Sequence, residues 1–547
     1  MHYELPVALK NTIWNAPEHH PGRMNELRPT LPKSKPDSIL VLRQGDDVAI
    51  SRRPLRSGEK LPISGDTLTV LDAIPSGHKI ALRDIAEGES VKKYGQVIGF
   101  SRCSIYRGNH IHLHNLAMRE FSRPFETGHA PTVAYYSEQE TPSFQGFVRA
   151  GGAIGTRNYI AVISNVNCSA SVSNYIRDHF RQRSADYARD FPHVDGVIAF
   201  THKSGCVIQP GEPSQILHRV LAGIARHPNI SGYVMMGLGC EGNQLQFIRR
   251  DFGLDHTRPG ENEPSFLTIQ AAGGTRKSVE AGIKAVEQLL PKADAARRSP
   301  VPLSKLILAE NCGGSDACSG ITANPALGWA SDELIRHGGT SVLAETPEIY
   351  GAEHLLAQRA ATPEVASQLI ALVRWWEEHV RLHGASIDNN PSFGNKEGGL
   401  TTIFEKSLGA IAKGGQSPLT AVYKYAEPVL GRGLCFMDTP GFDPVSMTGL
   451  VAGGCNIGVF TTGRGSVYGC KPMPCIKVAT TTALFQWMNE DMDINAGTIL
   501  DGTESVADVG RRILEKIRLV ASGEKTKSEL AGLGDEEFAP WIQGPTL

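Results

Sequence analysis

Four cysteines each follow a short run of apolar, β-branched residues, and this repeated pattern points to thiolate chemistry. They are Cys168 in NVNC, Cys206 in HKSGC, Cys240 in GLGCEGNQ and Cys312 in ENCGGSD. Ligands collect at the carboxyl ends of strands in open α/β sheets, so cysteines placed there could converge on one centre. Thiolates favour iron, zinc or an iron–sulfur cluster. The pattern is also compatible with cysteines that are small buried residues packed under turns.

Three glycine-rich loops carry side chains suited to an oxyanion or to hydroxyl groups. Ser315 and Asp316 lie in CGGSD, a sequence that favours a backbone nest around an anion. Asn395 and Lys396 lie in PSFGNKEGG, and Arg464 stands between two glycines in TTGRGS. Arginine suits two-pronged binding of a carboxylate. The loops do not match a Walker or Rossmann pattern, and each alone is also compatible with an ordinary turn.

Histidines are concentrated near the N-terminal side of the chain. His78 and Lys79 follow a glycine in PSGHKIAL, and His110, His112 and His114 alternate in NHIHLHN. On a strand the alternating histidines would all face one side, where they could bind a metal or a polyol. A solvated edge strand and a structural histidine are the other interpretations. An imidazole titrates near neutral pH, which makes His78 our candidate for an acid or a base.

The composition excludes several classes of protein. The chain has 547 residues, more than one ordinary core accommodates, so several domains are expected. The formal net charge is -2, which favours neither nucleic acid nor an anionic membrane as partner. The first residues do not resemble a signal peptide, and about 18 consecutive apolar residues occur nowhere. We therefore expect a cytoplasmic protein whose ten cysteines are thiols or metal ligands rather than disulfides.

Changes in sequence texture predict five segments. Residues 1–37 are rich in Pro, His and Asn and are expected to form an extended arm. Residues 38–117 have short apolar runs between Gly, Pro and Asp turns, which is typical of a small β domain. Residues 118–142 are a polar linker, and residues 143–300 and 301–547 alternate strand-like and helical patterns. Such alternation predicts α/β domains with parallel sheets and crossover helices.

The elements expected to position these residues follow from hydrophobic periodicity. Short β-branched runs predict buried parallel strands. In the α/β part we expect strands at 159–164, 194–200, 232–238, 305–309, 340–344, 433–437 and 457–461, and helices at 171–181, 215–226 and 363–382.

The longer motifs resemble a known family. RAGGAIGTRNYIAV, GLGCEGNQ, CGGSDACSGITANPALG, PSFGNKEGG, TTGRGS and DINAGT are similar to the altronate and galactarate dehydratases, over most of the chain from about Ile39. The small β domain resembles the family's SAF-type domain, which is a separate subunit in related sulfolactate lyases. The resemblance implies a hydro-lyase that depends on ferrous iron. The sequence leaves open whether the iron is mononuclear or part of an iron–sulfur cluster.

Within the family, TPEIYGAEHLL (residues 346–356) and the histidine-rich NHIHLHN favour the altronate branch. The N-terminal arm and HKSGC depart from the family pattern. The alternatives are a galactarate dehydratase, another sugar-acid or sulfolactate lyase, and a non-catalytic regulator that binds a sugar acid. The expected partners are a small sugar acid and, in a homo-oligomer, further copies of the chain.

The implied reaction assigns roles to the candidate residues. D-altronate would lose water to give 2-dehydro-3-deoxy-D-gluconate, with a base at C2, an acid at the C3 hydroxyl and a metal stabilising the developing charge. The expected catalytic residues are His78, Lys79 and Lys396. The expected substrate-binding residues are Asn395, Arg464, Ser315 and Asp316, and the expected metal ligands are Cys206, Cys240, Cys312 and Glu241.

Overall fold

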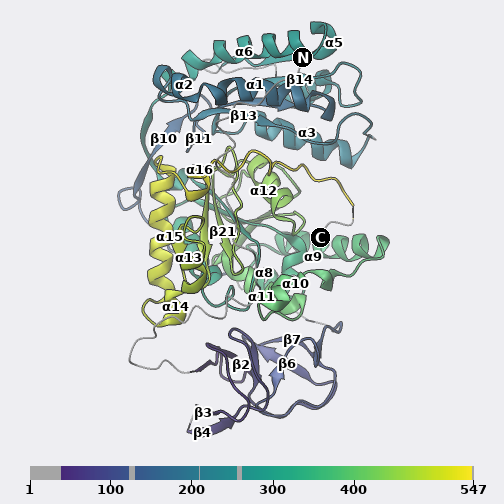
Figure 1. Ribbon diagram of the computed structural model, residues 1–547, viewed down its shortest axis with the longest axis vertical. Coiled ribbons are helices and arrows are strands. Elements are labelled where there is room, and N and C mark those ends of the chain that lie inside the picture. Colours follow the sequence, from purple (N-terminus) through teal and green to yellow (C-terminus); the bar gives the residue numbers. More distant parts are fainter. Residues whose placement is uncertain are drawn as a thin grey trace, which may run out of the picture. The chain divides into compact units, whose positions relative to one another are not determined.

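The computed structural model describes residues 38–63, 65–121, 123, 130–208, 210–254 and 262–544. The predicted arm, residues 1–37, and part of the predicted linker at 118–142 lie outside the described residues. Residues Asp37–Leu547 form one compact unit. Its N-terminal part is built from β-strands, and the α/β part follows (Figure 1).

The N-terminal part is a small antiparallel β domain, as the alternation of short apolar runs and turns predicts. Its sheets have the orders β1-β2-β5-β8 and β6-β7-β9, and β3 and β4 form a hairpin. The strands are β1 (Ile39–Leu40), β2 (Val48–Ser51), β3 (Lys60–Ile63), β4 (Asp66–Thr69), β5 (Lys79–Ala81), β6 (Ser90–Lys93), β7 (Gln96–Ser101), β8 (His110–Ile111) and β9 (Leu116–Ala117).

The first α/β domain contains a parallel sheet of four strands in the order β13-β12-β14-β15. These strands are β12 (Tyr159–Ser164), β13 (Gly196–Phe200), β14 (Ile230–Gly237) and β15 (Ser265–Thr268). Every residue of β12 is buried, because helices cover both faces of the sheet. Helices α1 (Ala170–Gln182) and α6 (Thr275–Ala295) pack on one face, and α3 (Glu212–Ala225) packs on the other (Figure 1).

The second α/β domain contains a parallel sheet of seven strands in the order β19-β20-β18-β17-β21-β22-β23. Helices α7 (Ala323–Arg336) and α15 (Val506–Ala521) pack on one face, and α12 (Asp443–Ala452) packs on the other. The strands are β17 (Ile307–Cys312), β18 (Thr340–Leu343), β19 (Leu419–Tyr423), β20 (Gly433–Met437), β21 (Ile457–Thr462), β22 (Cys475–Ala479) and β23 (Ile494–Asn495).

A three-stranded antiparallel sheet joins the two α/β domains. Its central strand β10 (Ser143–Val148) pairs with β11 (Ile154–Gly155) and with β16 (Arg298–Pro302). The remaining α-helices are α2 (Ser184–Asp190), α4 (Leu245–Phe252), α5 (Ile269–Ala272), α8 (Glu353–Gln358), α9 (Pro363–Leu382), α10 (Phe393–Glu397), α11 (Ile403–Ala410), α13 (Thr482–Trp487), α14 (Thr498–Asp501) and α16 (Lys527–Leu530).

Several expected elements are confirmed with their limits. The strands at 159–164 and 433–437 and the helix at 363–382 have the predicted bounds. Helix α9 begins where the sequence places a cap: the Thr362 hydroxyl accepts a hydrogen bond from the Val365 amide, and Pro363 takes the first helical position.

His110, His112 and His114 do not lie on one strand, contrary to the expectation from their alternation. Strand β8 ends at Ile111, and a turn follows it. Asn115 closes this turn, because its side-chain oxygen accepts a hydrogen bond from the His112 amide at 3.0 Å and its side-chain nitrogen donates to the His110 carbonyl at 2.9 Å. Asparagine competes with strand pairing through such local hydrogen bonds.

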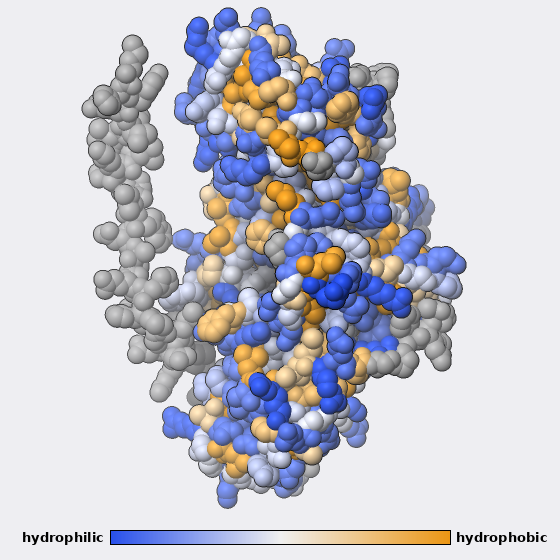
Figure 2. Space-filling view, turned by 90° about the vertical axis from the view of Figure 1, so that its right-hand side faces the viewer, coloured by the Kyte–Doolittle hydropathy of each residue, from blue (hydrophilic) through white to orange (hydrophobic). Residues whose placement is uncertain are grey.

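Across the described residues, every helix is too short or too polar to cross a membrane. On the face drawn in Figure 2, hydrophobic residues form separate patches between hydrophilic ones.

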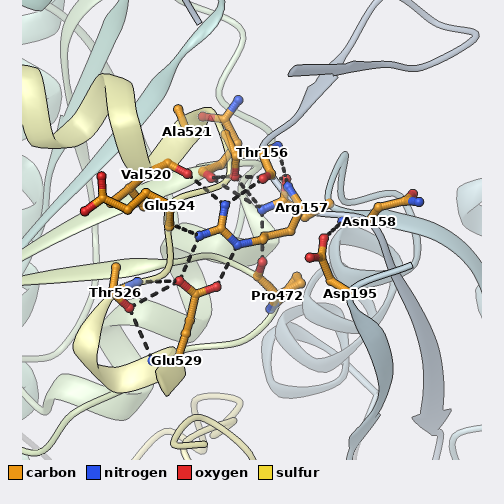
Figure 3. A network of polar contacts seen from close by, with 12 residues as sticks. Thr156, Arg157, Asn158, Asp195, Pro472, Val520, Ala521, Glu524, Thr526 and Glu529 are labelled. Atoms are coloured by element: carbon orange, nitrogen blue, oxygen red, sulfur yellow. Dashed lines mark hydrogen bonds and ion pairs between the residues drawn. The ribbon is translucent and has the colours of Figure 1, made fainter. Parts of the chain in front are cut away.

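The buried Arg157 fastens the C-terminal helices to the four-stranded sheet (Figure 3). It lies just before β12, and its guanidinium forms two hydrogen bonds with the carboxylate of Glu529, at 2.6 and 2.8 Å. The same guanidinium donates to the carbonyl oxygens of Thr156, Val520 and Glu524, each at 2.8 Å. One side chain thus satisfies acceptors from α15, from α16 and from the chain between them.

We predict that Arg157→Met lowers the free energy of unfolding by about 3–5 kcal/mol, because it removes the cation that is paired with the buried Glu529 carboxylate. Urea denaturation followed by circular dichroism measures the change. The matched control is Arg181→Met, which breaks an ion pair with Asp535 whose arginine side chain is 64% exposed and costs about 1 kcal/mol or less. Equal losses in the two variants would contradict the importance of the Arg157 network.

Candidate active site

The β domain contacts a glycine-rich loop of the second α/β domain, and most of the predicted site residues lie at this contact. The Nε2 atom of His78 lies 3.1 Å from the carbonyl oxygen of Glu397. The Lys79 ammonium donates to the carbonyl oxygen of Gly399 at 2.7 Å. The two predicted catalytic residues of the β domain therefore flank the segment that carries Lys396.

A buried ion cluster holds the contact together. The carboxylate of Glu405 accepts hydrogen bonds from Lys79, at 2.9 and 3.1 Å, and from Lys93, at 2.8 Å. All three side chains are buried, and Thr401 also donates to Glu405, through its amide and its hydroxyl. Although burial acts against the charged carboxylate, the two ammonium groups hold the pKa of Glu405 well below its usual range. Burial, together with repulsion from Lys93, lowers the pKa of Lys79 to about 8.

His78, His110 and His112 form a compact group of imidazoles. One ring nitrogen from each lies within 4.8 Å of the others, and His78 Nδ1 is 3.0 Å from His110 Nε2. The buried Nδ1 atom of His112 has no hydrogen-bond partner among the described residues. The ring of His114 also packs against that of His110, with centroids 5.5 Å apart. The rings therefore gather as expected, although a turn rather than a strand brings them together.

The pKa values of the histidine group are lowered, which keeps the rings in the neutral form that binds cations. Burial, followed by the charges of neighbouring histidines and of Lys79, lowers the pKa of His110 to about 4. Burial and the same kinds of neighbour lower the pKa of His112 to about 3, and burial lowers the pKa of His78 as well. The rings are thus neutral at pH 7, and neutral imidazole is the form that binds metals.

The glycine-rich loops of the seven-stranded sheet approach one another closely. A Cβ atom on Gly398 would lie 3.0 Å from the Cβ of Asp316 and 3.3 Å from the Cδ of Arg464. A Cβ on Gly463 would collide with the Asp316 carboxyl group. The Arg464 guanidinium is 3.6 Å from the Glu397 carboxylate and 37% exposed. The predicted residues of three loops therefore belong to one site.

Two of the predicted substrate-binding residues hold the loops in place. The Asn395 amide nitrogen donates to the Ser315 carbonyl at 2.8 Å, and its oxygen caps α10 by accepting from Ser392. The buried Asp316 accepts hydrogen bonds from the Ser319 hydroxyl and the Thr480 hydroxyl.

The remaining loop groups have different surroundings. The Ser315 hydroxyl is buried and has no hydrogen-bond partner among the described residues. Lys396 is half-buried and Arg464 is exposed, so the Arg464 guanidinium is accessible from solvent.

Cys312 lies beneath these loops in a buried group that the sequence did not predict. Its thiol, Glu345 and Glu348 form a set of possible ligands within 4.8 Å of one another. Two lysines already supply cations: Lys413 lies 3.1 Å from the thiol and 2.7 Å from Glu345, and Lys406 lies 2.5 Å from Glu348. Burial and the neighbouring Glu348 raise the pKa of Glu345 to about 7. The set is an internal ion network rather than an open site.

Cys206, Cys240 and Glu241 belong to the other parallel sheet. Both thiols are exposed, whereas Cys312 is buried in the seven-stranded sheet. The Glu241 carboxylate accepts hydrogen bonds from the amides of Leu238 and Gly239, at 3.1 and 2.5 Å, and so shapes its loop. The structure does not bring Cys312 together with Cys206 and Cys240.

Sequence reasoning missed Glu405, Lys93, Glu345 and Lys413. One signal was available for Glu405: it lies beside a lysine in the mostly apolar segment IFEKSLGA, every residue of which is buried in α11. A charged residue at such a position requires a partner.

The site sets neutral imidazoles of a small β domain against glycine-rich loops of a parallel α/β sheet, an arrangement typical of an enzyme. Three family models match the chain. They are described as Altronate/galactarate dehydratase SAF domain, residues 37–119; D-galactarate dehydratase/Altronate hydrolase, second domain, residues 146–294; and D-galactarate/Altronate dehydratase, C-terminal, residues 303–546.

Named relatives extend over nearly the whole chain. An altronate dehydratase of Bacillus subtilis is 36% identical over 93% of this chain and 100% of its own. An altronate dehydratase of Escherichia coli is 33% identical over 92% and 98%, and an E. coli galactarate dehydratase (L-threo-forming) is 37% identical over 90% and 94%. The chain belongs to the altronate/galactarate dehydratase family and is a sugar-acid dehydratase, a carbon–oxygen hydro-lyase.

The lowered histidine pKa values predict a loss of stability in acid. Below pH 6.5 the unfolded chain binds protons at His110 and His112, while the folded chain resists them until pH 4 or below. The unfolded state then binds more protons, so the free energy of unfolding falls as the pH falls from about 6.5 to about 4.

Urea midpoints of chelator-treated protein at pH 7 and pH 5 measure this loss. His112→Gln should show a smaller drop than the wild type, and His193→Gln in the first α/β domain should show the full drop. A full drop in His112→Gln would disprove the contribution of this group.

Proposed function

We propose that this dehydratase converts D-altronate into 2-dehydro-3-deoxy-D-gluconate and water, at the contact between the β domain and the second α/β domain. One observation carries the proposal: His78, beside the other imidazoles, touches the backbone of the loop that carries Lys396, and this loop abuts Arg464. Imidazoles that can hold a metal and cations that can bind an acid therefore meet in one place.

Arg464 and Lys396 bind the carboxylate of the substrate in this proposal. The contact of Arg464 with Glu397 is long and partly exposed, so it is a weak ion pair that a substrate carboxylate can replace. The Lys396 ammonium neutralises the negative charge that develops on the carboxylate when the C2 proton leaves. Asn395 and Asp316 keep the loops that bear these cations in position.

His78, His110 and His112 fit the ferrous iron that the family resemblance implies. The Nε2–H of His78 can donate to the Glu397 carbonyl, which leaves its Nδ1 lone pair directed toward His110. Metal-binding histidines are commonly fixed by such a carbonyl. The unpartnered Nδ1 of His112 completes the set. Bound iron would supply positive charge that eases removal of the weakly acidic C2 proton. His78 is then a ligand rather than the acid or base.

The choice of altronate follows from residues 346–356 and the histidine-rich NHIHLHN. Glu348 of the first segment contacts Lys406, the neighbour of Glu405, directly behind the site. The relatives named altronate dehydratase and galactarate dehydratase are about equally similar to the chain, at 36% and 37% identity. The choice between the two substrates is therefore tested by a direct assay.

We predict that reduced protein supplied with ferrous iron forms a 2-keto-3-deoxy acid from D-altronate. The measurement is a keto-acid assay on a panel of D-altronate, galactarate and sulfolactate. Turnover of galactarate without turnover of altronate would show that the substrate is galactarate and not altronate. If none of the acids gives a product, the enzymatic role is contradicted.

Single variants separate the two roles within the site. His78→Ala should lower turnover by about 10–100-fold or more and also lower bound iron, because it removes a proposed metal ligand. Lys396→Met should lower turnover while iron remains, because only the charge facing the substrate is lost. His193→Ala is the control for both readouts. Unchanged iron in His78→Ala, with turnover lost, would return His78 to the role of acid or base.

A further inference from the structure

Three thiols lie at one edge of the four-stranded sheet, apart from the site described above. The sheet order places β12 between β13 and β14, and all three strands are parallel. Cys168, Cys206 and Cys240 follow β12, β13 and β14 respectively, and all three are exposed. The carboxyl ends of adjacent parallel strands share one edge, which is where such sheets bind ligands.

Hydrogen bonds lock the three cysteine loops to one another. The Asn167 amide donates to the Ser204 carbonyl at 2.9 Å, joining the loop of Cys168 to that of Cys206. The Gly242 amide donates to the carbonyl of Cys206 at 2.8 Å, joining the loop of Cys206 to that of Cys240. Gly205 permits this packing: its φ is +98°, and a Cβ there would lie 2.8 Å from the Asn165 carbonyl oxygen.

Side chains complete this frame. The Asn243 side-chain nitrogen donates to the backbone and side-chain oxygens of Asn165, at 2.9 and 3.0 Å. His202 lies 2.9 Å from the Ser164 carbonyl at the end of β12. The cysteines thus project from a rigid support, which is what a metal site requires of its ligands.

The thiols interact with one another. Burial, together with the neighbouring thiols of Cys206 and Cys240, raises the pKa of Cys168. The Gln270 amide donates to the sulfur of Cys240 at 3.2 Å. Glu241 is the nearby carboxylate, but backbone amides already occupy it. Three sulfurs with an amide donor remain open to solvent.

We propose that Cys168, Cys206 and Cys240 bind an iron–sulfur cluster. Soft thiolates select iron–sulfur clusters, zinc or copper. The distances between the sulfur atoms favour a cluster among these. Among the described residues, donor atoms lie within 4.8 Å of one another in the histidine group and in the Cys312 group, but not in the group of three thiols. A cluster separates its cysteine sulfurs more widely than a single ion does.

Three cysteines would hold three irons of a four-iron cluster and would leave the fourth iron without a protein thiolate. Each thiol binds as a thiolate and releases its proton to solvent. The Gln270 amide would tune the potential through its hydrogen bond to a cluster sulfur. This site is independent of the proposed site at His78.

Anaerobic reconstitution of the full chain with ferrous iron and sulfide tests the proposal. We expect acid-labile sulfide, the broad visible absorption of an iron–sulfur cluster and an electron paramagnetic resonance signal after reduction. Cys168→Ser, Cys206→Ser and Cys240→Ser should each lose most of the sulfide. Cys103→Ser, which removes an exposed thiol of the β domain, is the matched control.

His78→Ala should keep the sulfide and the resonance signal, which separates this proposal from the proposed function. The proposal is overturned if the reconstituted protein lacks sulfide, if it binds only one zinc or iron ion per chain, or if the three serine variants retain as much sulfide as Cys103→Ser. Circular dichroism of each variant checks that a loss of sulfide is not a loss of folding.

Discussion

The candidate active site depends on two buried ammonium groups sharing one buried carboxylate. Lys79 and Lys93 come from the β domain and Glu405 from the second α/β domain. Removing a partner from such a cluster leaves a charge in a medium that solvates it poorly, at a cost of about 3–5 kcal/mol. The β domain is therefore held where both lysines reach Glu405, and this position sets His78 against the Glu397 carbonyl.

Further buried acids are paired with lysines behind the loops. Glu405 is followed in α11 by Lys406, which turns to Glu348, and Lys413 pairs with Glu345 and approaches Cys312. Burial alone would neutralise isolated acids of this kind. Here each acid is paired with a lysine, and Glu348 also accepts a hydrogen bond from Asn390, which precedes the loop of Asn395. Two kinds of potential metal ligand are thus kept apart: imidazoles at the domain contact and exposed thiols on the other sheet.

Much of the fold was predictable because a strand that is buried on both faces has a continuous apolar sequence. The run at 159–164 contains few polar residues, and the helix at 363–382 begins directly after Thr362, with proline as its first residue. The turn at His112 was missed because a single asparagine side chain outweighed the alternation of the histidines. The glycine-rich loops identified Lys396 and Arg464, since glycine allows the close approach that such loops need.

The rest of the site depends on distant pairings. Lys79 and Glu405 are 326 positions apart, and local patterns carry no information on such a contact. Cys312 was expected to join Cys206 and Cys240 because all three follow strand-like runs. The chain instead distributes those strands over two separate sheets, an arrangement set by the order of crossovers rather than by local sequence.

The central claim is that iron binds where the β domain meets the second α/β domain. Crystals of the intact protein, grown with ferrous iron under anaerobic conditions and measured at the iron absorption edge, test it most directly. We predict an anomalous peak within bonding distance of the ring nitrogens of His78, His110 and His112, beside the loop of Lys396. A fully loaded, active protein whose anomalous density lies only elsewhere would contradict it.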